Sequence, residues 1–280
     1  MGIEIHGLNL LKFARSKQAF GRVATIGRQE LFVPKDKLKN ALNLKNYTKY
    51  GVYCEELLTR HFAATAVESF DNSDFEHATH IADMNKPLAV QNRYDTVIDY
   101  GSLEHIYNIP QALRNVSELC SVDGQILHIL PANNFCGHGF WQFSPELFFA
   151  LYSEPNGYKE TEVFLADLAD AQFWYQVREP RDGERALVHS STEMFVLVRT
   201  RRTKVFSHEN VQQSDYAFAW KRNQISSLNI SKIKGLVRRT AFGPFVMETY
   251  WKWKRNAPST PTALSSENPH LIKIAVSSLV

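Results

Sequence analysis

Short apolar, β-branched segments alternate with amphipathic segments from residue 21 to about residue 201. The segment 94–102 (YDTVIDYGS) has the apolar, β-branched centre of a strand that is buried on both faces. We expect this segment and six other apolar segments of the chain to form one sheet. The expected strands are 22–29, 65–70, 78–84, 94–102, 124–131, 162–168 and 193–201.

Helical patterns fill the intervals between these strands. Residues 51–62 and 109–120 each carry apolar side chains at helical spacing, and the second segment has Pro110 near its first turn. Ser144 followed by Pro145 is typical of a helix start. Strands that alternate with helices predict an α/β, doubly wound, mostly parallel sheet with helices on both faces. In such sheets the ligand lies beyond the carboxyl ends of the strands.

The alternation weakens after residue 205, so we expect three parts: a Rossmann-like domain over 1–205, a basic and aromatic extension over 206–255, and a flexible linker and tail over 256–280. The extension contains a helical pattern at 229–240 and the run YWKWKR at 250–255. The apolar end 271–280 is either a strand that docks on the core or on a second copy, or a disordered tail.

Acidic residues stand at the ends of three successive expected strands. Asp71 can accept hydrogen bonds from the two hydroxyls of a ribose, or it can cap the turn at Asn72-Ser73. Asp83 can bind the exocyclic amine of an adenine beside Met84, or it can form the turn before Pro87. Asp99 is the third acidic residue, and the recurrence itself favours a ligand site.

The order of these residues resembles class I S-adenosylmethionine-dependent methyltransferases. The resemblance rests on a glycine after the first strand, Asp71 and Asp83 after the next two, the run DYGSLEHI at 99–106, and the fifth strand GQILHILP at 124–131. It covers about residues 20–201 and is most specific over 65–131. It implies a seven-stranded, mostly parallel sheet and S-adenosylmethionine as cofactor.

The resemblance also implies roles for individual residues. Asp71 with Asn72 would hold the ribose, and Asp83 with Met84 would bind the adenine. The loop at Gly27 and Arg28 would pass the methionine part of the cofactor. The sulfonium and the substrate would be bordered by Asp99, Tyr100, Gly101 and Ser102.

The first loop departs from the family pattern D/E-x-G-x-G-x-G, since it keeps Gly27 and has Arg28 and Gln29 where further glycines would stand. Glycines there let the backbone approach the cofactor closely. Arg28 either pairs with the methionine carboxylate or blocks the pocket. In the second case the chain would be a non-catalytic, methyltransferase-like binding or scaffold module.

Residues 133–143 (NNFCGHGFWQF) follow the fifth strand and place His138 between two glycines. Our hypothesis is that His138 is a general base that removes a proton from a substrate hydroxyl. The alternative is a histidine that hydrogen-bonds loop carbonyls. His105, beside Glu104, and Tyr100 are weaker catalytic candidates.

Composition and charge narrow the class of protein. The chain is 44% hydrophobic and carries a net charge of +3. Residues 206–256 hold nine Lys/Arg against three Asp/Glu, which suits either a phosphate, acidic sugar or membrane surface as partner, or merely a solvated basic face. No apolar run reaches the roughly 18 residues of a membrane span, and the N-terminus lacks the features of a secretory signal.

The cysteines and histidines indicate no metal. Cys54, Cys120 and Cys136 are far apart without a CxxC pair, so we expect neither a disulfide framework nor structural zinc, and a cytoplasmic location. The histidines show no HxH or HExxH motif, so no metal site is expected.

Together these features predict transfer of a methyl group to a hydroxyl (or amine) of a small polar metabolite or sugar, or an acidic metabolite. Oxygen is preferred because His138 offers a base. A dinucleotide-dependent oxidoreductase is disfavoured because no G-x-G-x-x-G exists. Trp251 and Trp253 could stack on nucleic-acid bases, but packing against the core explains them better. The sequence is also compatible with a homodimer.

Overall fold

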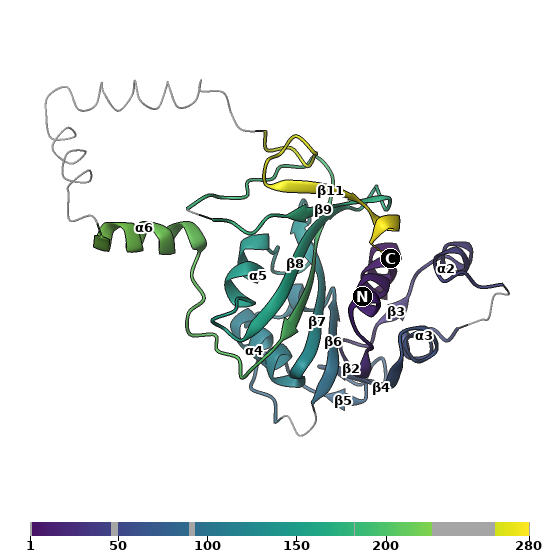
Figure 1. Ribbon diagram of the computed structural model, residues 1–280. Helices are drawn as coiled ribbons and strands as arrows, with labels where there is room; N and C mark the ends of the chain where they lie inside the picture. Colours follow the sequence, from purple (N-terminus) through teal and green to yellow (C-terminus); the bar gives the residue numbers. More distant parts are fainter. Residues whose placement is uncertain (1, 46–49, 90–92, 182, 226–260, 280) are drawn as a thin grey trace, which may run out of the picture.

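A nine-stranded sheet forms the centre of the molecule (Figure 1). The computed structural model describes residues 2–45, 50–89, 93–181, 183–225 and 261–279. Along the sheet the strands stand in the order β11-β9-β8-β10-β7-β6-β2-β4-β5, and a separate parallel pair joins β1 to β3. The strands are β1 (Gly2–Ile3), β2 (Gly21–Ile26), β3 (Glu30–Leu31), β4 (Ala64–Asp71), β5 (His80–Ile81), β6 (Tyr94–Tyr100), β7 (Cys120–Asn133), β8 (Tyr158–Asp167), β9 (Phe173–Val177), β10 (Met194–Arg202) and β11 (Leu271–Ala275).

One half of the sheet is parallel and doubly wound. β2 pairs in parallel with β4 and β6, β4 pairs with β5, and β6 pairs with β7. We number the five parallel strands from 1 to 5 in chain order, so that β2 is 1 and β7 is 5. Across the sheet they then stand in the order 3-2-1-4-5 of a Rossmann-like sheet. The winding reverses between β2 and β6. The ligand site expected for this architecture lies outside the carboxyl ends of those two strands.

The other half of the sheet is antiparallel. β10 runs antiparallel between β7 and β8, β9 pairs with β8, and β11 pairs with β9. The predicted seven-stranded, mostly parallel sheet is thus wrong in the number and direction of its strands, whereas the α/β architecture is confirmed. A parallel neighbour needs a crossover of a dozen or more residues. The connection from β8 to β9 spans only residues 168–172, which suits an antiparallel pair.

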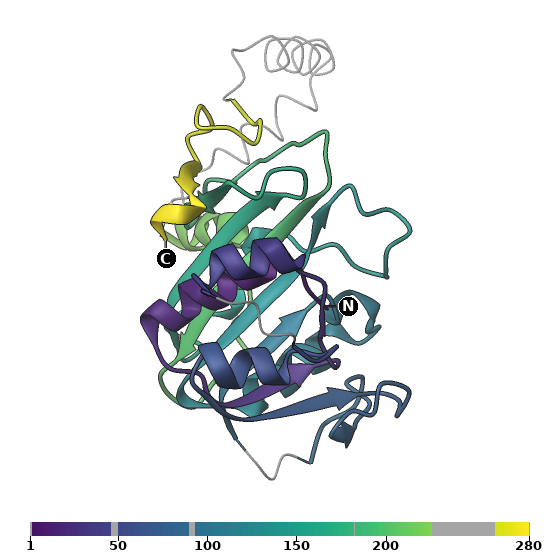
Figure 2. The ribbon, with the colours of Figure 1, turned by 90° about the vertical axis from the view of Figure 1, so that its right-hand side faces the viewer.

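Helices cover both faces of the sheet, and neighbouring strand residues point to opposite layers (Figures 1 and 2). Val97 packs in the layer that contains α4 and α5, whereas Ile98 packs in the layer that contains α1 and α3. Burial on both faces explains the unbroken apolar centre of β6. The helices are α1 (Ile5–Lys17), α2 (Lys35–Ala41), α3 (Glu55–His61), α4 (Ile109–Leu119), α5 (Pro145–Leu151) and α6 (Ser214–Ile225).

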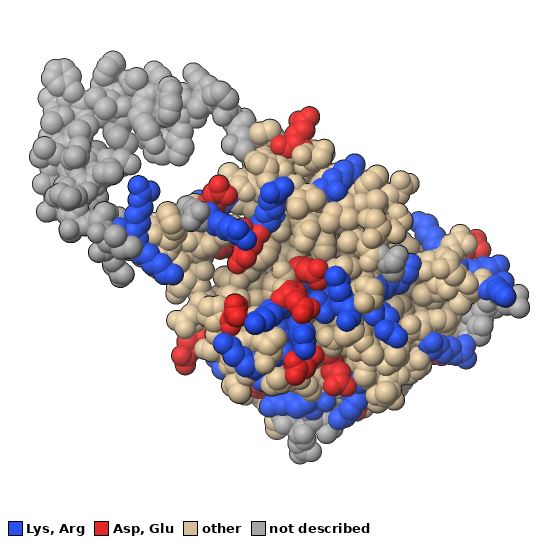
Figure 3. Space-filling view, in the orientation of Figure 1, with Lys and Arg blue, Asp and Glu red and all other residues tan. Residues whose placement is uncertain are grey.

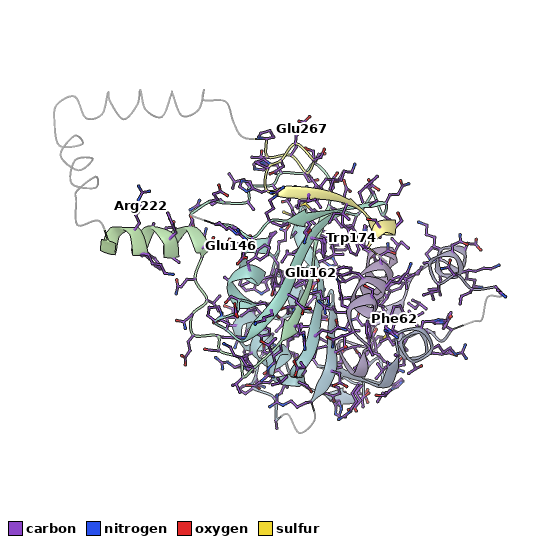
Figure 4. The ribbon with its side chains drawn as sticks, viewed as in Figure 1. Phe62, Glu146, Glu162, Trp174, Arg222 and Glu267 are labelled. Carbon is purple, nitrogen blue, oxygen red and sulfur yellow. The ribbon has the colours of Figure 1, made fainter. Side chains whose placement is uncertain are left out.

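Helix α1 was not expected from the sequence. The Glu4 carboxylate begins it by accepting hydrogen bonds from the backbone N–H groups of His6 and Gly7, each at 2.8 Å. From His6 to Ala14 every residue except the half-buried Lys12 is buried, and the helix packs on the sheet beside Trp174 (Figure 4), whose indole N–H donates to Nδ1 of His6 at 3.0 Å. A helix segment that is buried on all sides shows no polar face, so its periodicity is weak.

Residues 261–279 lie along the antiparallel edge of the sheet. β11 extends β9, the buried Asn268 amide donates to the carbonyls of Leu187 and Ala263, and Val276 joins the core layer of α1. The apolar end thus docks as a strand on the chain's own sheet. The expected helix at 229–240 and the basic run at 250–255 lie outside the described residues. Among the helices that the structure describes, none combines the length and apolarity that a membrane crossing requires.

Candidate active site

The loop after β2 is closed by its own hydrogen bonds at the point where the winding reverses. Gly27 adopts a φ of +72° and its N–H donates to the Phe70 carbonyl at 2.7 Å. The Ile26 carbonyl accepts from the buried Gln29 amide at 2.7 Å and from the Ser102 hydroxyl. One glycine therefore forms the turn, with the Gly27 N–H bonding the loop to β4 and the Ser102 hydroxyl bonding it to the turn after β6.

Arg28 is held by groups of this chain. Its Nε pairs with the Glu55 carboxylate at 2.7 Å, and its terminal nitrogen donates to the carbonyls of Glu76 at 2.9 Å and His77 at 3.3 Å. The guanidinium lies 4.0 Å from the ring centroid of Tyr53. Arg28 therefore ties the end of β2 to α3 and to the loop after β4. A cofactor carboxylate would have to compete with Glu55 for it.

Asp71 sits in a turn at the end of β4 and is half-buried. Its Oδ1 accepts a hydrogen bond from the Ser73 N–H at 3.3 Å, and the neighbouring Asn72 is exposed. Among the described residues no hydrogen bond reaches the other carboxylate oxygen. The turn and a ribose contact are thus compatible at this position.

The Asp83 carboxylate has more hydrogen-bond and ion-pair partners than that of Asp71. Hydrogen bonds from the Asn85 side chain at 2.9 Å and the Asn85 backbone at 3.0 Å, with the Lys86 ammonium at 3.0 Å, hold the pKa of Asp83 below its ordinary value. Met84 is buried in the core. A cavity of about 410 Å³ adjoins Asp83 and is lined by Phe70, His80, Lys86, Leu88 and Tyr94 among others.

Asp99 is fully buried and forms the floor of the site. Its Oδ1 accepts from the N–H groups of Ser102 and Leu103, and its Oδ2 lies 2.7 Å from Nδ1 of His128. The other ring nitrogen of His128 lies 2.7 Å from the Tyr152 hydroxyl. Both carboxylate oxygens of Asp99 thus accept hydrogen bonds from this chain. Asp99 therefore acts on the site by positioning the turn that follows β6.

Tyr100 and Gly101 follow directly. The Tyr100 side chain points into the other core layer, against Gly7 of α1, and burial raises the pKa of its hydroxyl well above the ordinary value. Gly101 turns the chain with a φ of +79°. In this arrangement Tyr100 does not reach the carboxyl edge where His105 and His138 lie.

The structure brings His105 and His138 together around Glu104. Nε2 of His138 lies 3.6 Å from Oε1 of Glu104, and Nε2 of His105 lies 3.9 Å from the same oxygen. The two imidazole ring centroids are 5.3 Å apart. Both histidines are exposed, whereas the Glu104 side chain is 2% exposed. We name these three residues the Glu-His-His cluster.

The glycines beside His138 have a structural reason. Gly137 and Gly139 adopt φ values of +88° and +75°, and a Cβ on Gly139 would stand 2.7 Å from the Glu104 carbonyl oxygen. The Phe140 N–H donates to that carbonyl at 2.7 Å. The loop is thus fastened to the turn after β6, which fixes His138 above Glu104.

Burial and the negative charge of Asp99 raise the pKa of Glu104 to about 8. Burial and the neighbouring His138 lower the pKa of His105. At neutral pH the cluster therefore combines a carboxyl that retains its proton with an imidazole that is neutral. Such pairs of shifted groups are typical of acid–base sites. Glu104 was not predicted as a site residue, and its position before His105 in the turn after a parallel strand was the available signal.

Exposed aromatic side chains lie in the two loops that carry the cluster. Tyr107, Phe140 and Trp141 are exposed, and the Trp141 indole donates to the Ile106 carbonyl at 2.9 Å. A cavity of about 530 Å³ lies beside them, lined by Tyr107, Pro110, Trp141, Phe143 and Leu147 among others. On the face shown in Figure 3, Lys and Arg side chains are interspersed with Asp and Glu side chains.

Comparison with known proteins finds no matching family model and no matching curated protein. Similar solved structures include the N-methyltransferase NodS from Bradyrhizobium japonicum WM9 (12% identity, TM-score 0.39, 70% of this chain and 93% of that one). Another is TehB from Haemophilus influenzae (14%, 0.38, 70% and 62%). A third is 1,6-didemethyltoxoflavin-N1-methyltransferase from Burkholderia thailandensis, with S-adenosylhomocysteine bound (13%, 0.38, 71% and 78%). Two of these three structures are named as methyltransferases.

Proposed function

We propose that this protein is an S-adenosylmethionine-dependent methyltransferase whose acceptor is a hydroxyl, or alternatively an amine, of a small polar metabolite or sugar. The observation that carries the proposal is the placement of candidate residues on both sides of the reversal between β2 and β6. Asp71 and Asp83 follow β4 and β5 on one side, and the Glu-His-His cluster follows β6 and β7 on the other. Cofactor and acceptor thereby receive adjacent places at one edge of the sheet.

The residues on the cofactor side fit a nucleoside. The carboxylate of Asp71 has an oxygen to offer a ribose hydroxyl, and the cavity beside Asp83, walled by Phe70 and Tyr94, suits an adenine ring. S-adenosylmethionine, when bound, supplies a methyl group that is already activated. The ion pair of Arg28 with Glu55 closes the loop on this side, so the methionine part of the cofactor would have to open it.

On the acceptor side, the chain orients the acceptor and takes up its proton. The aromatic side chains Tyr107 and Trp141 offer apolar faces against which a sugar or a ring can lie. His138, exposed and fixed by its glycines, accepts the proton from the acceptor hydroxyl at Nε2. Alignment of the acceptor with the methyl group supplies the remainder of the rate enhancement.

Titration calorimetry with S-adenosylhomocysteine tests the cofactor side. We expect micromolar binding, which corresponds to about −8 kcal/mol, and at least tenfold weaker binding for Asp71→Ala. Asp74→Ala, which removes an exposed carboxylate from the same loop, is the matched control and should bind like the wild type. Equal affinities of the two variants would overturn the role of Asp71.

A second candidate function is a non-catalytic, methyltransferase-like binding module. The observation that favours it is Arg28, whose ion pair with Glu55 closes the cofactor side with the chain's own groups. Absence of S-adenosylhomocysteine binding at millimolar ligand, in both the wild type and Arg28→Ala, would establish this alternative.

A further inference from the structure

We propose that the Glu-His-His cluster is a binding site for a transition-metal dication of the kind that imidazole and carboxylate ligands accept, such as Zn²⁺. The proposal goes beyond methyl transfer, because it requires neither the cofactor nor the acceptor. It also runs against the expectation from the sequence, in which no local metal motif exists.

The first argument is the spacing of the ligand atoms. One ligand atom from each of Glu104, His105 and His138 lies within 4.8 Å of the other two. The carboxylate–imidazole distances of 3.6 and 3.9 Å exceed hydrogen-bond length, so the three groups converge without bonding directly. Ligands at about 2.1 Å from a tetrahedral ion stand roughly 3.4 Å apart. A small contraction around an ion would therefore satisfy all three.

The second argument is an unpartnered oxygen. Glu104 is 1% exposed, and its Oε2 has no hydrogen-bond partner within the part of the chain that the structure describes. Among the described residues no lysine or arginine pairs with this carboxylate. Buried polar groups in folded proteins are nearly always bonded, and buried carboxylates are paired or ligate metals. A dication would replace the proton of this buried carboxyl and supply the countercharge of the ionised carboxylate, which the described residues do not provide.

The third argument concerns access and rigidity. Both imidazoles reach solvent, with His105 45% and His138 55% exposed, so an ion has an entry path. The bond from the Phe140 N–H to the Glu104 carbonyl fixes the His138 loop to the turn that carries the other two ligands. Three protein ligands leave one position open toward the mouth of the site, which is typical of catalytic rather than structural zinc sites.

Metal binding and proton uptake would use the same nitrogen of His138. The ion-bound form therefore lacks the free base, and any acceptor that reaches the open position meets a Lewis acid in its place. The two states are distinguishable, because the metal can be removed with a chelator.

The test is calorimetric titration of the chelator-treated full chain with Zn²⁺ in a non-coordinating buffer. We expect one equivalent to bind with micromolar or tighter affinity. His138→Ala and His105→Ala should each weaken binding at least tenfold, and both positions are exposed, so the variants should fold. Glu104→Gln should weaken binding while keeping the shape of the buried side chain.

His77→Asn is the matched control, since His77 is exposed, lies outside the cluster, and has a φ of +52° that asparagine tolerates. It should bind Zn²⁺ within twofold of the wild type. Absence of a saturable one-equivalent site, or equal affinities of His138→Ala and His77→Asn, would overturn the proposal. Asp71→Ala should retain Zn²⁺ binding, so a failure of the cofactor site does not imitate a failure of the metal site.

Discussion

The two sides of the carboxyl edge treat their charged groups in opposite ways. On the cofactor side, Arg28 is paired with Glu55, and Asp83 with Lys86 and Asn85. On the acceptor side, Glu104 and the two histidines converge at 3.6 and 3.9 Å without hydrogen bonds among them. Groups that are satisfied within the chain are stable without a ligand. Groups that converge unsatisfied cost stability, and a functional site explains that cost.

Asp99 lies beneath both sides, so its removal gives the largest expected effect. Asp99→Ala removes the partner of Nδ1 of the buried His128 and deprives two backbone N–H groups of their acceptor. We expect a loss of about 3–5 kcal/mol in the free energy of unfolding, measured by urea denaturation. Tyr152→Phe, which removes only the outer hydroxyl, should cost about 1 kcal/mol. Similar costs for the two variants would show that the network is not centred on Asp99.

Two glycines beside His138 allow a matched comparison of how rigidly the acceptor side is held. Gly139→Ala combines a positive φ with a clash against the Glu104 carbonyl, whereas Gly137→Ala meets only the positive φ, with nothing within 4 Å of the new Cβ. We expect losses of roughly 2–3 kcal/mol and 1 kcal/mol respectively in thermal unfolding. Only Gly139→Ala should also weaken Zn²⁺ binding. Equal behaviour would mean that close approach to Glu104 is unimportant.

His208, which lies outside the Glu-His-His cluster, is expected to make the free energy of unfolding depend on pH in the acidic range. Burial, with a smaller effect of Arg114, lowers the pKa of His208 from 6.5 to about 4. Its folded pKa lies below the unfolded one, so the unfolded chain binds the extra proton and stability falls from pH 6.5 to pH 4. Because the group is only half-buried, we expect its contribution to the fall in the free energy of unfolding to be about 2 kcal/mol, and His208→Gln should remove that contribution. An unchanged pH profile of unfolding would assign the loss to other groups.

The smallest effect is expected on the cofactor side. Arg28→Ala should bind S-adenosylhomocysteine up to about tenfold more tightly, or about 1.4 kcal/mol, because it removes the ties that close the loop. Arg60→Ala, which removes an exposed arginine paired with Glu56 on α3, is the control and should leave the affinity unchanged. Weaker binding by Arg28→Ala would instead make Arg28 a cofactor ligand.

Local patterns predicted much of the parallel half of the fold. β4, β6, α4 and the Ser144 cap of α5 lie at or within a residue or two of the expected positions. The predicted strand 78–84 shrinks to His80–Ile81, because Asp83 and Asn85 use their side chains for a turn. Strand β9 was missed, and β11 was left open because its partner β9 is distant from it in the sequence.

By itself, the sequence determined the alternation of strands and helices and the acidic residues at the strand ends, since propensity and turn chemistry act over a few neighbouring residues. Only the tertiary structure decided that Arg28 would be tied to Glu55, that Tyr100 would face α1, and that His138 would meet Glu104 and His105. The last contact joins residues 34 positions apart in the sequence. It forms because parallel pairing of β6 and β7 aligns their carboxyl ends, and no local pattern encodes that alignment.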